Sequence, residues 1–247
     1  MKTKIGVPDN PIYNFILQDI EEVKSKFNVE IYKLPENQIS KLMLDNKLQM
    51  ALVNPLIFTK IFKNSDYRII NDLCICSVGY TGLGVLNLHP NSLRISKILS
   101  NCVDDFFLEI AKLLISERYD QFPIISKFEN DYELNPNEAI FSYNDLNSQL
   151  DISEDWYESY EIPLVYGFWI IRNEEEPENY KEIIKDLAKD NFQSEIPIAL
   201  SNNEYNREGT IITYWDDEIK NSLKQIYELL FAAKIIDDIP ELKFIEN

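Results

Sequence analysis

Apolar positions along the chain alternate between short strand-like runs and longer stretches with helical spacing. The clearest run, Leu164 to Ile171, is apolar on both faces and begins directly after Pro163. Such a run is typical of a strand buried in the middle of an α/β sheet. A polar, acidic helix that carries Trp156, Tyr157 and Tyr160 is predicted just before the proline.

The first 53 residues predict the order strand, helix, strand, helix, strand. Asn10 followed by Pro11 is a typical helix start, and Pro35 opens a second helix. The expected strands are Ile5–Val7, Val29–Tyr32 and Met50–Val53. One face of the first helix carries Ile12, Ile16, Ile20, Val23 and Phe27, and the second helix is expected to bury Ile39, Leu42 and Leu44. This order requires parallel strands with right-handed crossovers.

The rest of the chain continues the alternation. Further strands are predicted at 67–75, 82–88, 97–99, 124–127 and 139–142, and helices at 104–117 and 180–189. A last helix has apolar residues at helical spacing: Ile219, Leu223, Ile226, Tyr227 and Leu230. Two crossings of the chain then predict two lobes, one of residues 1–85 with 172–247 and one of residues 86–171.

Composition places the 247-residue chain among folded globular proteins, with 45% hydrophobic residues. The formal net charge of −18 argues against nucleic acid, because affinity for polyphosphate comes from clustered Lys and Arg. It also disfavours anionic membranes, and no run of about 18 apolar residues could span a bilayer. A small anionic ligand would have to be held by local donors that act against the overall field.

Cysteine and histidine usage excludes several kinds of site. The three cysteines form no Cys-x-x-Cys pair and His89 is the single histidine, so a zinc site or a histidine-based catalytic triad is excluded. Cys74 and Cys76 are interpreted as small buried hydrophobic residues rather than metal ligands. The odd cysteine count and the lack of an apolar N-terminal run favour a cytoplasmic protein with reduced thiols.

Five segments carry a resemblance to a known family, and they are spread along nearly the whole chain. They are Lys4–Gly6, Gln49–Val53, Leu113–Arg118, Asp151–Tyr157 and Ile162–Trp169. They resemble the menaquinone-biosynthesis family of the futalosine route, and within it the chorismate dehydratases. The resemblance implies an α/β fold of the two-lobed type 2 periplasmic-binding-protein class, with mixed sheets and an interlobe cleft.

The resemblance also implies a reaction and a set of site residues. In that family chorismate loses water to give 3-[(1-carboxyvinyl)oxy]benzoate, without a cofactor. Thr81 and Asn10 are the expected catalytic contacts, and backbone amides of residues 79–82 are expected to receive an anionic end of the substrate. Other expected substrate contacts are Gly79, Tyr80, Gly82, Asn54, Asp104, Asp105, Tyr143, Asn144 and Tyr166. Structural roles stay open for several of them, as a helix cap for Asn10 and as a turn residue for Thr81.

Two groups of residues allow more than one interpretation, the glycines near residue 80 and the aspartates at 104 and 105. Gly79, Gly82 and Gly84 predict either unusual dihedrals with close approach of another group, or a bulge between lobes. Asp104 and Asp105 stand where the family carries Ser-Arg-Thr-Ser at a helix start. There each aspartate would cap the helix and would repel a carboxylate about 6 Å away by roughly 3 kcal/mol. The alternatives are therefore a binding protein for a neutral or cationic molecule, and a protein-interaction module. We expect a small-molecule ligand in the cleft, and a homodimer stays open.

Overall fold

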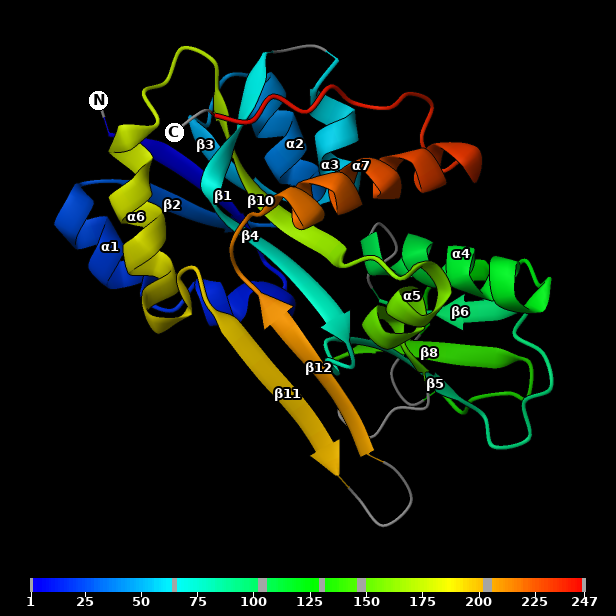
Figure 1. The fold of residues 1–247 in the computed structure, drawn as a ribbon. Coiled ribbons are helices and arrows are strands. Elements are labelled where there is room, and N and C mark those ends of the chain that lie inside the picture. Colours follow the sequence, from blue (N-terminus) through cyan, green and yellow to red (C-terminus); the bar gives the residue numbers. More distant parts are fainter. Residues whose placement is uncertain are drawn as a thin grey trace. The chain divides into compact units, whose positions relative to one another are not determined.

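The structure, a computed structural model, describes residues 2–63, 66–101, 106–128, 132–145, 150–201 and 206–245. The chain divides into two compact units (Figure 1). Unit 1 comprises residues 1–76, 165–196 and 212–247, and unit 2 comprises 77–164 and 197–211. These limits differ from the expected lobe limits at residues 85 and 171, and residues 197–211 belong to unit 2. The physical reason is local pairing, since Tyr80 N donates a hydrogen bond to Glu208 O at 3.0 Å.

The larger sheet has seven strands in the order β11-β12-β4-β10-β3-β1-β2. Its strands are β1 (Lys4–Pro8), β2 (Glu30–Leu34), β3 (Met50–Val53), β4 (Tyr67–Gly79), β10 (Leu164–Arg172), β11 (Glu195–Ser201) and β12 (Asn206–Ile212). β1 pairs in parallel with β2 and with β3, which confirms the predicted parallel start. β10 is the central strand, is antiparallel to β3, and is buried from Leu164 to Ile171 as predicted.

The helices of unit 1 are η1 (Pro11–Ile16), α1 (Ile20–Phe27), α2 (Glu36–Leu44), α3 (Pro55–Ile61), α6 (Glu178–Ala188), η2 (Lys189–Asn191) and α7 (Asp217–Ala232). Of these, η1 and α2 begin where the sequence predicts, after Asn10 and at Pro35. Asn10 Oδ1 accepts from Ile12 N at 3.2 Å, and Asn54 Oδ1 accepts from Ile57 N at 2.8 Å. Each side chain thus satisfies a donor that a helix start leaves without a partner.

Two details of the predicted helices are wrong. The single helix expected over Ile12 to Phe27 is broken at Leu17 (φ −122°), because Gln18 N bonds to Leu187 O at 2.9 Å instead of continuing the helix. In α2 the buried apolar residues are Ile39 and Met43, four positions apart, while Leu42 and Leu44 are half-buried.

The smaller sheet has five strands in the order β7-β6-β8-β5-β9. They are β5 (Gly84–Leu88), β6 (Lys97–Leu99), β7 (Ile124–Ser126), β8 (Glu138–Tyr143) and β9 (Leu150–Asp151). β5 is antiparallel to β8, whereas β6 is parallel to β7 and β8, so both sheets are mixed. Helices α4 (Phe106–Tyr119) and α5 (Ile152–Tyr160) cover one face of this sheet (Figure 1).

β11 and β12 were not predicted from the sequence. Along β11 exposed and half-buried residues alternate, and Pro197 interrupts the apolar pattern. Proline cannot donate to a ladder and is confined to sheet edges, and β11 is a terminal strand of its sheet.

Within the described ranges, the structure contains no helix with the length and apolar character needed to cross a bilayer.

Candidate functional site

The turn between β4 and β5 is built on glycines. Gly79 and Gly82 both have φ +69°, a left-handed conformation that side chains rarely adopt. A Cβ on Gly79 would lie 2.7 Å from Glu208 O, and one on Gly84 would lie 2.7 Å from the ring of Phe107. The glycine cluster therefore meets both conditions that the sequence predicted, unusual dihedrals and close approach of other groups.

Asp151, the N-cap residue of α5, binds this turn through hydrogen bonds to its side chain. Its Oδ1 accepts from Glu154 N at 2.9 Å, and its Oδ2 accepts from Gly82 N at 2.6 Å and from Thr81 N at 3.3 Å. The carboxylate has no exposed surface. Two of the amides that we expected to receive an anionic end of the substrate, those of Thr81 and Gly82, are therefore bound to a side chain of the protein itself.

Arg207, from β12, adds a half-buried positive charge near Asp151. Its Nε donates to Glu154 Oε2 at 2.8 Å, its Nη2 also contacts that oxygen, and its guanidinium lies 4.2 Å from the ring centroid of Tyr80. Burial raises the pKa of Asp151 to about 6, while the three N–H bonds and the charge of Arg207 act to lower it.

A groove of about 490 Å³ runs between α5 and the strands β11 and β12. Its size lies in the range of small-molecule sites. The residues that line it are Val78, Gly79, Glu154, Tyr157, Glu158, Pro197, Ile198, Ala199, Glu208, Gly209 and Thr210. Three carboxylates thus share the groove with one tyrosine and a short apolar wall.

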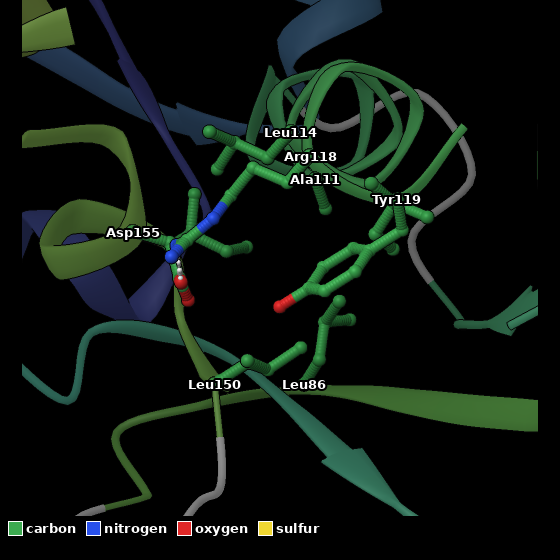
Figure 2. A pocket seen from close by; sticks show the side chains of 9 residues that line it. Leu86, Ala111, Leu114, Arg118, Tyr119, Leu150 and Asp155 are labelled. Carbon is green, nitrogen blue, oxygen red and sulfur yellow. Dashed lines mark hydrogen bonds and ion pairs between the residues drawn. The ribbon is translucent and has the colours of Figure 1, made fainter. Parts of the chain in front are cut away.

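A second cavity lies under α4 and is shown in Figure 2. Leu86, Leu114 and Leu150 give it an apolar lining, and the hydroxyl of Tyr119 points into it. The ion pair of Arg118 and Asp155 closes one side. Burial raises the pKa of Asp155 to about 6, and Arg118 acts to lower it. The interior of about 10 Å³ fits about one water molecule, which makes this a packing space rather than a ligand site.

The predicted contacts in unit 1 lie on buried elements. Asn10 and Asn54 follow β1 and β3, which are parallel neighbours, so both lie at the carboxyl ends of these strands. Asn54 Nδ2 also donates to Glu36 Oε2 at 2.7 Å. Tyr166 is fully buried in β10, and its carbonyl accepts from Tyr13 Oη at 2.9 Å. Asn10 therefore has the capping role that the sequence left open, and Asn54 caps α3, a role that was not predicted.

The predicted contacts in unit 2 lie around the turn. Gly84 pairs with Tyr143, and Asn144 N donates to Leu83 O at 3.1 Å. Thr81 is buried, and its hydroxyl accepts from Leu83 N at 3.3 Å, as a turn residue would. The structure thus brings Thr81, Gly82, Tyr143 and Asn144 together. Asp104 and Asp105 lie outside the described residues.

The sequence analysis did not select Asp151, Glu154 or Arg207. A signal for the first two exists, because Asp followed three residues later by Glu is a typical helix start. Arg207 has no local signal, since it belongs to a strand that the pattern did not predict. In the described ranges no group of three or more His, Cys, Asp and Glu side chains could hold a metal ion.

Comparison with known proteins decides the family. A family model described as menaquinone biosynthesis matches residues 4–225. The chain belongs to this menaquinone-biosynthesis family. No curated protein sequence matches the chain.

The solved structures that resemble this family member are distant in sequence. Protein AF1704 from Archaeoglobus fulgidus has a TM-score of 0.57 at 14% identity, over 95% of this chain and 98% of that one. CA3427 from Candida albicans, described as having the generic periplasmic-binding-protein fold, scores 0.49 at 8% identity over 76% of this chain and 70% of that one. XAC2383 from Xanthomonas citri, bound to chloride ion, has a TM-score of 0.48 at 9% identity, over 94% of this chain and 98% of that one.

Family membership and the two mixed sheets confirm the predicted fold class. The menaquinone-biosynthesis family member is a mixed α/β protein with two mixed sheets. AF1704 shares this fold over nearly its full length. The cleft expected between the lobes stays a prediction.

Proposed function

We propose that this menaquinone-biosynthesis family member is a hydro-lyase of the chorismate dehydratase type. The family match over residues 4–225 is the observation that carries the proposal. In the reaction a ring C–H bond and the C–OH bond of chorismate break, and one water molecule leaves. The ring of the product, 3-[(1-carboxyvinyl)oxy]benzoate, is aromatic. Because the ring becomes aromatic, the reaction itself supplies much of the driving force. The protein has to orient the substrate and accept a proton from it.

The test is direct incubation of purified protein with chorismate, with detection of the dehydrated product by liquid chromatography and mass spectrometry. We expect product with the native protein and none with heat-denatured protein. Absence of product at high protein concentration would contradict the proposal.

Paired variants test the two expected catalytic contacts. For Thr81, Thr81→Ser keeps the hydroxyl while Thr81→Val removes it at similar volume. For Asn10, Asn10→Asp keeps the oxygen that caps η1 and removes the amide donor. We expect Thr81→Val and Asn10→Asp to lose at least tenfold in kcat/KM, and Thr81→Ser to lose less. Equal activity of all variants would exclude these side chains from the reaction.

A second candidate is a non-catalytic binding protein for a neutral or cationic small molecule. The observation that favours it is the groove beside α5, where Glu154, Glu158 and Glu208 line a space of ligand size next to Tyr157. A carboxylate ligand would meet three carboxylates there, of which Glu154 is paired with Arg207 and Glu158 with Arg118. Because Asp151 occupies the amides of Thr81 and Gly82, those donors do not compensate the repulsion.

A thermal-shift comparison of chorismate with phenethylamine separates the two candidates. A ligand of the native state raises the melting temperature according to its concentration and affinity. Under the second candidate we expect the amine to raise the melting temperature and Glu158→Gln to reduce the shift. A shift with chorismate alone would exclude the cationic ligand.

A further inference from the structure

The four most exposed large apolar side chains among the described residues belong to two segments of unit 2, residues 92–99 and 119–126. Leu93 is 95% exposed, Phe122 76%, Ile124 61% and Tyr119 48%. We call these four residues the β7 surface. Phe231 and Ile239, at 47% each, are the next most exposed and belong to unit 1.

Hydrogen bonds hold the parts of the β7 surface next to one another. β6 and β7 run in parallel with Lys97 opposite Ile124, so the segments that precede both strands meet at the same end of the sheet. Ile124 N donates to Ser96 O at 3.1 Å, and Ile95 N donates to Gln121 Oε1 at 2.5 Å. These bonds bring the segment that carries Leu93 next to the segment that carries Phe122 and Ile124.

The area of this patch is that of an interface rather than of ordinary surface. A large side chain presents roughly 150–250 Å² when fully exposed, so the four together expose on the order of 500 Å². Patches of this size on monomers are often functional. Two such patches facing each other would bury about 1,000 Å², which reaches the lower limit of specific protein interfaces.

The strand at the centre of the patch is the terminal strand of its sheet. Among the described strands, β7 pairs with β6 alone. Because Ile124 N and Ser126 O bond toward β6, the backbone groups of Ile125 between them are directed away from it. A terminal strand of this kind accepts another strand through main-chain hydrogen bonds.

Charge determines which partner fits. Residues 90–127 hold five basic and five acidic residues, whereas the whole chain has a net charge of −18. The segment that carries the β7 surface is therefore balanced, and all of the excess negative charge lies elsewhere. Two copies of this acidic protein would therefore repel each other less through this segment than through segments that carry the excess negative charge.

We propose that two copies of the chain form a dimer through the β7 surface. A two-fold axis places the same patch on both sides and makes the two β7 strands antiparallel across it. Leu93, Phe122 and Ile124 of each copy then cover those of the other. The dimer is independent of the hydro-lyase activity, because every residue that carries it lies outside the turn and the groove described above.

The test is the mass in solution, from light scattering and sedimentation equilibrium between 1 and 200 µM. We expect a concentration-dependent mass that reaches twice the 29.0 kDa of the chain. Phe122→Glu and, separately, Leu93→Glu are expected to weaken association at least tenfold. Phe231→Glu is the matched control, an exposed phenylalanine on α7 whose replacement is expected to leave the dimer intact.

Circular dichroism and the melting temperature of each monomeric variant confirm that it folds. Both substituted side chains are largely exposed in the single chain, so neither replacement should unfold it. A wild-type mass that stays at that of one chain at 200 µM overturns the proposal. A dimer that Phe231→Glu weakens as much as Phe122→Glu also overturns it.

Discussion

Asp151 combines three backbone hydrogen bonds with complete burial. One carboxylate therefore caps α5 and fixes the turn between β4 and β5. Desolvation disfavours its charge, while the N–H groups and Arg207 favour it. The same side chain thus determines both the local stability of unit 2 and the donors left for an incoming anion.

Replacing Asp151 with alanine is expected to be strongly destabilising. The change leaves the amides of Thr81, Gly82 and Glu154 without their acceptor, and a buried donor without a partner costs about 1–3 kcal/mol. We expect a loss on the order of 3 kcal/mol in the free energy of unfolding, measured as the urea midpoint. Asp190→Ala, at an exposed position, is the control and should change the midpoint little. Equal midpoints for both variants would contradict this role.

The pH dependence of stability gives a second prediction for the same residue. The pKa of Asp151 is raised from 3.8 to about 6 in the folded protein, so its contribution is full below pH 3.8 and is lost as the pH rises through about 6. Two pKa units correspond to roughly 3 kcal/mol. The stability of the wild type relative to Asp151→Asn should therefore fall by about that amount between pH 4 and pH 7.5. A difference that stays constant with pH in urea titrations would show that Asp151 does not titrate in this range.

At the scale of elements, β12 and the end of β4 pass very close to each other. A Cβ on Gly209 would lie 2.1 Å from Tyr80 O and 2.5 Å from Tyr80 N, both of them backbone atoms. Such atoms cannot move away without displacing the turn that Asp151 holds. The glycine therefore permits the pairing that places Arg207 next to Glu154.

Gly209→Ala is expected to separate β12 from β4. We expect a loss of about 2–3 kcal/mol in unfolding free energy and faster amide exchange over residues 206–212. Gly6→Ala is the matched control, because its Cβ would meet Leu48 Cδ1 at 2.6 Å, the end of a side chain that can move. If Gly209→Ala lowers the unfolding free energy no more than Gly6→Ala does, the backbone around residue 209 can accommodate a Cβ.

At the scale of the whole molecule, the net charge of −18 affects the stability of the folded chain. Like charges that folding brings closer together repel, which lowers the stability of the compact state. Salt screens this repulsion, since the Debye length falls from about 30 Å at 0.01 M to about 10 Å at 0.1 M.

The melting temperature is therefore expected to rise by several degrees between 10 mM and 300 mM NaCl. Calorimetry or circular dichroism measures it, and KCl should give the same rise because the effect is one of ionic strength. A melting temperature that falls with salt would indicate that attractive ion pairs outweigh the repulsion.

Several features follow from the sequence because they depend on neighbouring residues alone. The run from Leu164 to Ile171 has apolar side chains on both faces and becomes the central strand. Asn10, followed by Pro11, caps a helix as predicted. The glycines at 79 and 82 adopt the left-handed dihedrals that other residues avoid.

Other features were decided only by tertiary structure. Gly82 and Asp151 are 69 positions apart, and Glu154 and Arg207 are 53 apart, so no local pattern links them. β12 becomes a strand because β4 provides a partner, and β11 because β12 does. The helix expected to continue past Leu17 ends because Gln18 N bonds to the carbonyl of Leu187. Residue propensity and hydrophobic periodicity determine which secondary structure each segment favours by itself. Hydrogen bonds between distant segments, made in a buried environment, determine where these preferences give way and where the charged groups of the candidate site meet.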